Sequence, residues 1–313
     1  MSDAQENKPD LTALGERLAR EVGVLAGRLA QYLTGSLPVA DGTVAEGQSF
    51  LWATFEQYSG GQPLASFEGS ALDRRPEGEP HPLDLLADAL ALSGTEVDLL
   101  LLAAMPEEHE GFAAVLRTLH PRAEARASVG LAAQLLFREP EERLRLRQLL
   151  KSGALVASGT LQLSGDRPFF ERSLVPAESL WSALHGVDAW PAAVQRIKTA
   201  VWTSGLGEWF ASLPTARAVE AIARGETCTV LVTADNEEMA FHRAMAMVQH
   251  AGREPAGIAL PAASEPELMK LIETHALARG VVPVLRLPTP DGPATPVVPS
   301  FSERSGAVVV CGR

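Results

Sequence analysis

The chain has 313 residues, and 46% of them are hydrophobic, which supplies enough apolar side chains for packed cores and argues against a disordered protein. Its formal net charge of −12 at pH 7 argues against nucleic acid as a default partner, because non-specific affinity for a phosphate backbone is largely electrostatic. Two cysteines, Cys228 and Cys311, are too few for a disulfide framework or a metal cage, and each is expected to be a buried, reduced thiol in an apolar run.

The N-terminal residues MSDAQENKPD are polar and acidic, and they lack the basic and apolar regions of a secretory signal. The most apolar stretch of the chain, residues 97–105, covers only about half of a membrane span. We therefore expect a cytoplasmic protein that does not associate with a membrane.

The first sixty residues predict two helices. Apolar side chains recur every three or four residues from Asp10 to about Gly35, which places them in one stripe on a helix. Such a stripe usually packs against its own domain, and a partner-binding helix is the alternative. A second helix is predicted over Glu46–Gln57. Residues 59–82 are rich in Gly, Pro and charge, which predicts a linker or a long surface loop.

The next hundred residues predict a winged-helix domain, which we place at 83–190. Past Gly153 the pattern changes to an alternation of apolar with small or polar residues, as in a half-buried strand. A turn at 166–168, a second strand and a closing helix over Glu178–His185 complete the layout. The helices expected before the strands are Pro82–Leu92, Thr95–Ala104, Glu107–Leu119, Val129–Phe137 and Glu141–Lys151.

The last part of the chain predicts a small parallel α/β unit. The β-branched run Thr227–Thr233 suits a buried parallel strand, and the alternation of strands and helices after it favours a parallel sheet. The further elements expected are the helices Asn236–His250 and Glu265–Ala278, the strands Gly257–Leu260, Val281–Leu287 and Ala307–Cys311, and a Pro-rich loop over 288–305.

The predicted fold class is therefore α/β overall, with a helix-rich N-terminal region that contains the winged-helix domain, followed by the parallel unit. The expected domains are an N-terminal helical region (1–58), a linker (59–82), the winged-helix domain (83–190), a helical connector (191–226) and the α/β unit (227–313). We expect four tryptophans to anchor the core between the two regions: Trp181, Trp190, Trp202 and Trp209.

The first strand-to-helix junction of the α/β unit is where a phosphate-binding loop would lie, with Gly-rich backbone amides and a lysine around the phosphates. Here the junction, TADNEEMAF from Thr233 to Phe241, contains no glycine and no lysine. Carboxylates stand in place of the phosphates, and like charges about 4 Å apart repel by on the order of 1–4 kcal/mol per pair. The degenerate phosphate-loop position is marked by Thr233, Asp235, Asn236 and Ala240.

The third strand supports the same interpretation. A nucleotide hydrolase ends this strand in an acidic residue that organises Mg²⁺ and water, whereas Val281–Leu287 runs into prolines and Asp291 comes four residues too late. We therefore predict no catalytic residues, no metal site and no bound cofactor in this chain. An enzyme with a site assembled from dispersed residues is not supported by any motif.

Two acidic motifs near residue 110 are interpreted as helix ends. His109 and Glu110 begin like the zinc metalloprotease motif, but Ala113 stands where the second histidine would be. Glu107 and Glu108, with Glu110, are candidates for paired carboxylates. They follow Pro106 at a predicted helix start, however, where acidic side chains meet the helix dipole favourably, and this favours a capping role.

The cluster Arg143, Arg145 and Arg147 has two interpretations. On a helix only Arg143 and Arg147 share a side, and Glu141 precedes Arg145 by the four residues that favour an ion pair. Much of the remaining helix surface is taken by leucines expected in a core, which favours a structural role: Leu144, Leu146, Leu149 and Leu150. The alternative is a face that binds nucleic acid or an acidic partner.

These segments resemble the N-terminal part of AAA-type ATPases that are encoded beside contractile injection systems. In that family a winged-helix segment of the type L-S-x-x-E-x-D-L-L-L-L is matched by Leu92–Leu102, and a closing hhxxLxG segment is matched by Leu180–Gly186. The family's degenerate ATPase-like unit resembles Thr227–Arg313, so the resemblance covers residues 82–313.

The resemblance implies a non-catalytic interaction or targeting module, whose protein partners are components of a contractile injection particle. It also implies an active AAA+ module that binds ATP and forms a hexamer in a longer parent chain; a freestanding adaptor is the alternative to such a parent. A different class of function, a winged-helix regulator that binds nucleic acid through residues 143–147, stays open.

Overall fold

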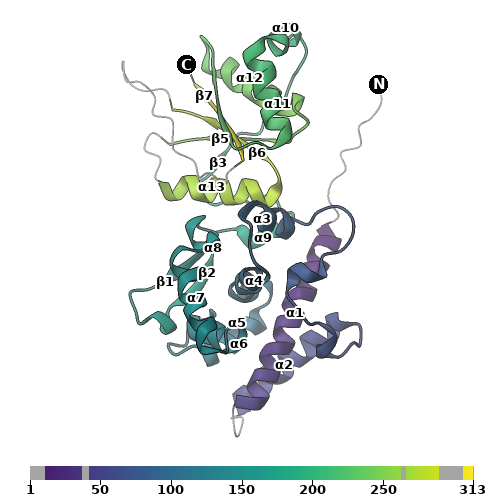
Figure 1. The fold of residues 1–313 in the computed structure, drawn as a ribbon, viewed down its shortest axis with the longest axis vertical. Helices are drawn as coiled ribbons and strands as arrows, with labels where there is room; N and C mark the ends of the chain where they lie inside the picture. Colours follow the sequence, from purple (N-terminus) through teal and green to yellow (C-terminus); the bar gives the residue numbers. More distant parts are fainter. Residues whose placement is uncertain (1–10, 37–41, 262–265, 289–305, 313) are drawn as a thin grey trace. The chain divides into compact units, whose positions relative to one another are not determined.

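The computed structural model describes residues 11–36, 42–261, 266–288 and 306–312 (Figure 1). The chain divides into two compact units, Met1–Asp188 and Ala189–Arg313. The first is rich in helices and the second contains a five-stranded, mostly parallel sheet, so the predicted α/β class is confirmed. Within the described residues no helix has the length and apolarity needed to span a membrane.

The first unit begins with two helices that lie side by side, α1 (Leu11–Ser36) and α2 (Gly42–Ser59) (Figure 1). The predicted apolar stripe of α1 is buried, and Leu18, Leu25 and Leu29 are at most 2% exposed. The stripe therefore packs within its own unit, which confirms that interpretation over a partner-binding helix.

Residues 59–82, expected to be a linker or surface loop, contain two 3₁₀ turns, η1 (Leu64–Ser66) and η2 (Ala71–Arg74). The segment packs on α1 and on the later helix α4. Phe67 joins a small apolar cluster with Val24 of α1 and Phe55 of α2. These residues therefore lie in the same compact unit as the helices on either side of them.

Three ion pairs join one side of α1 to the segment that follows α2. Their α1 members are separated by four and by seven residues, which places them on one side of the helix. The pairs are Arg17–Asp84 (2.8 Å), Glu21–Arg74 (2.6 Å) and Arg28–Asp98 (3.1 Å).

Arg17 and Asp84 form the most buried of these pairs, with 3% and 5% of each residue exposed. Burial opposes ionisation of Asp84, but the hydrogen bonds and charge of Arg17 outweigh it and lower the pKa of the carboxyl. Arg75 contacts the same carboxylate at 3.1 Å and also pairs with Asp88 on the surface. Asp84 thus balances two guanidinium groups, one of them inside the core.

The substitution Asp84→Ala leaves the buried Arg17 guanidinium without its partner, and we expect it to lower the free energy of unfolding by about 3–5 kcal/mol. The matched control is Asp88→Ala, which removes the exposed partner of Arg75 and should cost less than about 1 kcal/mol. Urea unfolding followed by circular dichroism measures both. Equal losses in the two variants would contradict the structural role given to the buried pair.

The helices and strands of the winged-helix region follow the predicted order. They are α3 (Pro82–Leu90), α4 (Gly94–Glu108), α5 (Glu110–Leu119), α6 (Val129–Leu136), α7 (Pro140–Ser152), α8 (Ala154–Ala157), β1 (Leu161–Ser164), a 3₁₀ turn η3 (Phe169–Glu171), β2 (Ser173–Pro176) and α9 (Leu180–Leu184). The start of the predicted first strand is instead the helical turn α8, closed where the Ser158 hydroxyl donates to the Ala154 carbonyl.

Helix α4 is the centre of this region in Figure 1. Every residue from Glu96 to Met105 is buried, which is the pattern of a helix surrounded by protein on all sides. Strands β1 and β2 form an antiparallel hairpin. The β2 side of the hairpin also pairs with residues 127–129, through Ser128 opposite Ser173.

His81 precedes α3 and caps its first turn. Its Nδ1 accepts the Leu83 N–H at 3.0 Å, so the neutral ring carries its proton on Nε2, which lies 3.2 Å from the Leu14 carbonyl. Burial lowers the pKa of His81 from 6.5 to about 4. Protonation of Nδ1 would remove the acceptor on which the cap depends.

The pKa of His81 is lower in the folded chain than in the unfolded chain. As the pH falls below 6.5, the unfolded chain therefore binds a proton at His81 while the folded chain does not. We expect this group to lower the free energy of unfolding by roughly 3 kcal/mol between about pH 7 and pH 4. His81→Asn keeps a cap acceptor and does not titrate. Urea unfolding at several pH values should show a shallower loss in the variant than in the natural chain. Parallel curves would contradict the assignment.

The second unit contains a sheet of order β3-β5-β6-β7-β4. All pairs are parallel except β3 with β5. The strands are β3 (Gln195–Arg196), β4 (Cys228–Thr233), β5 (Pro255–Ala259), β6 (Val282–Arg286) and β7 (Ala307–Gly312), and the helices are α10 (Gly207–Ala211), α11 (Leu213–Arg224), α12 (Glu237–His250) and α13 (Pro266–Arg279). The predicted Pro-rich loop lies outside the described residues, apart from Pro288.

The two faces of the sheet pack into separate cores. α11 and α12 contribute to the core that contains Val309 of β7, and α13 contributes to the core that contains Val310. β4 is parallel as predicted, but the prediction that it is buried is wrong. Within the described residues it pairs only with β7, and Leu231 is 55% exposed.

The tryptophans differ in their burial. Trp181 is buried, and Trp190 and Trp209 are half-buried. Trp202 is 71% exposed, so the prediction of a core position is wrong for this residue. Its indole stacks on the ring of His242 with 6.1 Å between the ring centroids. One face of the exposed Trp202 indole is therefore in contact with the His242 ring.

Candidate functional site

The parallel strands of the second unit end at one edge of the sheet, which is where open α/β sheets place their ligands. Thr233 is the last residue of β4, and Asp235 and Asn236 lie in the turn before α12; all three are exposed. Ala240 is fully buried in the core beneath the first turn of α12. The structure therefore brings three of the four predicted positions to the surface of this edge and places the fourth in the core.

The start of α12 is occupied by side chains of the chain itself. Asn236 is the N-cap, and its Oδ1 accepts the Glu238 N–H at 2.8 Å. Glu237 Oε1 lies 2.6 Å from Nε of Arg286, the last residue of β6. The Glu238 N–H and the Arg286 guanidinium could otherwise bind an anion, but both are already paired with side chains of this chain. This junction can stabilise the helix start, and its charge opposes a phosphate.

The Asn236 cap predicts a specific order of stability. Asn236→Ala removes the acceptor of the Glu238 N–H and should lower the free energy of unfolding by about 1 kcal/mol, whereas Asn236→Ser retains an acceptor and should recover most of the loss. Thermal unfolding of the two variants beside the natural chain measures the order. Two variants as stable as the natural chain would show that Asn236 is not a cap.

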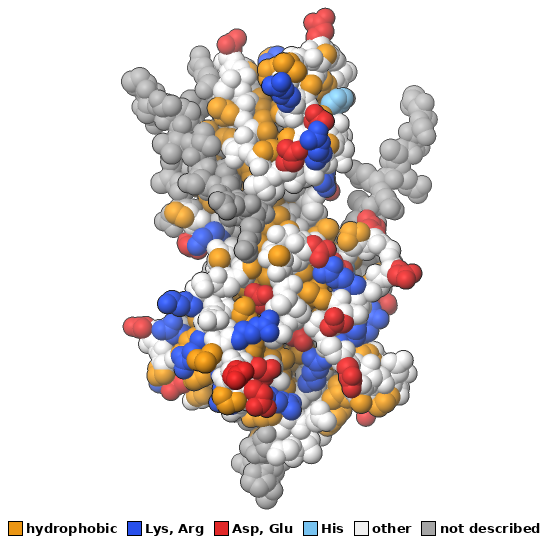
Figure 2. Space-filling model, viewed as in Figure 1, with side chains coloured by type: hydrophobic (Ala, Val, Ile, Leu, Met, Phe, Trp, Pro, Cys, Tyr) orange, Lys and Arg blue, Asp and Glu red, His pale blue; other side chains and the backbone are white. Residues whose placement is uncertain are grey.

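Helix α7 presents its basic side chains to solvent. Leu146 and Leu150 attach the helix to the domain, while Arg143, Arg145 and Arg147 are exposed. Leu144 is 64% exposed, so the prediction that it belongs to the core is wrong. Figure 2 shows Lys and Arg side chains, with hydrophobic and acidic ones beside them, over the part of the first unit where Figure 1 places α7.

Arg147 connects α7 to the hairpin. Its guanidinium carbon lies 4.6 Å and 4.8 Å from the ring centroids of Phe169 and Phe170, in the turn between β1 and β2. Cation–π contacts of this kind are worth about 0.5–1 kcal/mol at exposed sites. The helix surface and the tip of the hairpin are therefore held together by a side chain that stays exposed.

His120, Glu124 and Ser173 form a cluster with the residue types of a nucleophilic triad, but the direction of its hydrogen bonds differs from that of a triad. The Arg122 N–H donates to Nδ1 of His120, so the proton of the neutral ring is on Nε2, 3.0 Å from Ser173 Oγ. The serine hydroxyl oxygen accepts a hydrogen bond from this N–H, and the hydroxyl donates one to the Glu124 carboxylate. Ser173 is also 1% exposed. This cluster fixes β2 against the end of α5 and does not activate the serine.

The ionisation of this cluster agrees with its hydrogen bonds. Burial lowers the pKa of His120, which keeps the ring neutral. The hydrogen bond from Ser173, and then the ion pair with Arg167, lower the pKa of Glu124. No local sequence signal connects these residues, because about fifty positions separate Ser173 from its two partners.

The acidic motifs near residue 110 have different outcomes. Glu107 and Glu108 belong to the last turn of α4, so their prediction as a helix start is wrong, and Glu108 accepts from the Trp181 indole at 2.9 Å. Glu110 lies in the first turn of α5, as predicted. His109 caps that helix by accepting the Gly111 N–H, which confirms its assignment to a helix end.

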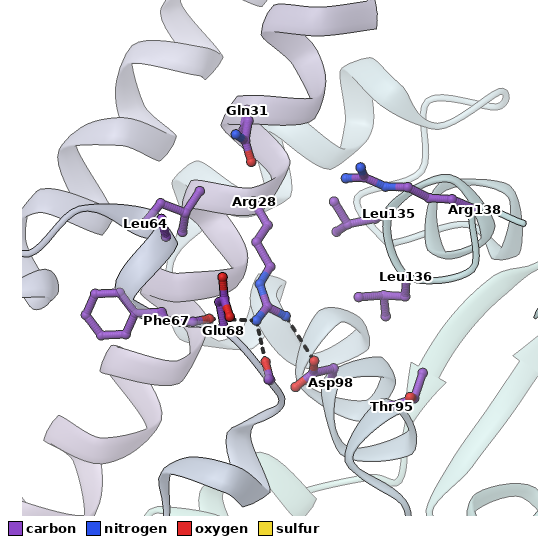
Figure 3. A pocket seen from close by; sticks show the side chains of 12 residues that line it. Arg28, Gln31, Leu64, Phe67, Glu68, Thr95, Asp98, Leu135, Leu136 and Arg138 are labelled. Atoms are coloured by element: carbon purple, nitrogen blue, oxygen red, sulfur yellow. Dashed lines mark hydrogen bonds and ion pairs between the residues drawn. The ribbon is translucent and has the colours of Figure 1, made fainter.

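An open cavity of about 440 Å³ lies beside α1 in the first unit (Figure 3). Arg28 reaches from α1 to Asp98 and donates to the Phe67 carbonyl at 3.0 Å. Burial raises the pKa of Asp98, although the Ala71 N–H and Arg28 oppose this effect. Arg28 is thus part of the packing of residues 67–71. Arg138, the second arginine that lines the cavity, lies apart from Arg28 in Figure 3.

The described residues contain no group of three or more His, Cys, Asp or Glu side chains placed to hold a metal ion. Both cysteines are free thiols. Cys311 is buried, and burial raises its pKa to about 12, whereas Cys228 is only half-buried, contrary to the expectation.

Comparison with known proteins agrees with the architecture of the first unit. Residues 72–178, about a third of the chain, match the family model described as "Winged helix domain, variant". No curated protein and no solved structure matches the chain. A winged-helix domain is consistent with a binding or regulatory module, for protein or for nucleic acid. The helices α6 and α7, the β1–β2 hairpin and this match together identify residues 72–178 as a winged-helix domain.

Proposed function

We propose that this chain is a non-catalytic interaction and targeting module of an AAA+ ATPase, which acts in the cytoplasm beside a contractile injection system. The observation that carries the binding role is the winged-helix domain with an exposed α7. The resemblance of residues 82–313 to the N-terminal part of such ATPases supports the ATPase and the injection particle as its context. Catalysis and ATP binding are assigned to an active module of a longer parent chain.

The start of α12 supports the absence of turnover in this chain. Asn236 caps the helix and Glu237 pairs with Arg286, so the junction that would hold a nucleotide is filled with acidic and amide side chains. An electropositive, glycine-rich cradle is the usual alternative at this position. We propose that the second unit is a packing element and that no cofactor is bound here.

The proposal predicts no ATP hydrolysis above background by the purified chain, because residues 233–241 offer neither a glycine nor a lysine to the triphosphate. A coupled phosphate-release assay with Mg²⁺ and ATP measures this, with the Asp235→Ala variant as the control. Turnover that disappears in Asp235→Ala would overturn the non-catalytic assignment.

The targeting role is tested separately by sedimentation of the purified chain with purified contractile injection particles. The chain should appear in the pellet with the particles and stay in the supernatant without them. A chain that stays in the supernatant in both cases would contradict this part of the proposal.

One observation favours the second candidate, a nucleic-acid-binding regulator: the exposed arginines of α7, next to a hairpin wing. Binding of that kind would weaken steeply with salt, by up to about a factor of ten for each contacted phosphate over a tenfold rise in salt concentration. Salt-independent binding, or none, removes this candidate.

A further inference from the structure

The charges of α7 are separated along its length. Its acidic residues lie at the start, where Glu142 accepts the Glu139 N–H at 3.0 Å in a capping box. From Arg143 to Ser152 the helix carries four basic side chains and no acidic one. The local charge of this stretch is therefore opposite to the net charge of the chain.

Four side chains of this stretch project to one side. At about 100° per residue, positions 143, 144, 147 and 151 fall within about a quarter to a third of a turn of one another. They place Leu144, 64% exposed, among Arg143, Arg147 and Lys151. We call these four residues the α7 face.

The α7 face is held in place before any partner binds. Leu146 and Leu150 are at most 3% exposed and attach the adjacent side of the helix to the domain, while Arg147 rests on the rings of Phe169 and Phe170. Arg143 and Lys151 form no ion pair with any residue that the structure describes. Two cations of the face are thus available for a partner's carboxylates.

We propose that the α7 face binds an acidic, amphipathic segment of a protein partner, which places an apolar side chain on Leu144 and carboxylates on the surrounding cations. Charge complementarity selects an acidic partner, and the exposed leucine selects one with an apolar side chain. A phosphate backbone meets only the charges of the face and leaves the exposed Leu144 without an apolar contact. This inference rests on the proposed binding function and specifies its partner.

The test uses the whole chain and a synthetic, fluorescein-labelled acidic peptide of about 18 residues, with Leu at helical spacing and Glu elsewhere. Fluorescence polarisation at physiological ionic strength gives the affinity. The variants are Arg143→Glu and Leu144→Ser, and circular dichroism checks that each is folded. The matched control is Arg145→Glu, which makes the same change of charge on the same helix but points roughly opposite to Arg143.

We expect Arg143→Glu and Leu144→Ser to weaken peptide binding by about fivefold or more, and Arg145→Glu by less than about twofold, in keeping with exposed charge pairs worth up to about 1 kcal/mol. Equal losses for the two arginine variants, no effect of Leu144→Ser, or no binding by the natural chain would overturn the proposal. A labelled DNA duplex that binds at least as tightly as the peptide would also overturn it, in favour of a nucleic-acid face.

The sedimentation assay separates this inference from the proposed function. If the natural chain and Arg143→Glu sediment equally well with the particles, the targeting role stands and the α7 face is rejected. If the natural chain does not sediment, the targeting role itself is rejected, whatever the peptide measurement gives.

Discussion

The first unit depends on the burial of charge along one side of α1. A guanidinium such as that of Arg17 cannot leave water unless a carboxylate meets it, because an unpaired buried charge costs several kcal/mol. The chain after α2 meets this requirement, because it returns along α1 and brings Arg74, Asp84 and Asp98 to their partners. The winged-helix domain is thereby built onto the N-terminal helices within one compact unit.

Local patterns in the sequence predicted the regular elements well, and features that depend on distant residues were missed. The apolar stripe of α1 is a property of a few neighbouring positions, so helical periodicity alone predicts it. The burial of Arg17 was not, because its partner Asp84 lies 67 residues away. The edge position of β4 was missed for the same reason, since strand order follows from the pairing of β4 with β7.

At the candidate sites, too, local sequence patterns were predicted and contacts between distant residues were not. The loss of glycine and lysine before α12 was evident from the sequence, but the pairing of Glu237 with Arg286 spans 49 residues and needed the structure. For α7, helical periodicity showed that Arg143 and Arg147 share a side. It did not show that Leu144 faces solvent, because a leucine between arginines fits a core equally well until the neighbouring elements are placed.

The contact of Arg147 with Phe169 and Phe170 has a consequence for the entropy of binding. A long side chain loses up to about 2 kcal/mol of rotamer freedom when it is immobilised. The two rings restrict Arg147 already in the free protein, so part of that loss belongs to folding and no longer opposes association. The hairpin turn therefore lowers the entropy cost of binding a ligand at α7, because Phe169 and Phe170 make Arg147 more rigid than the neighbouring arginines of the helix.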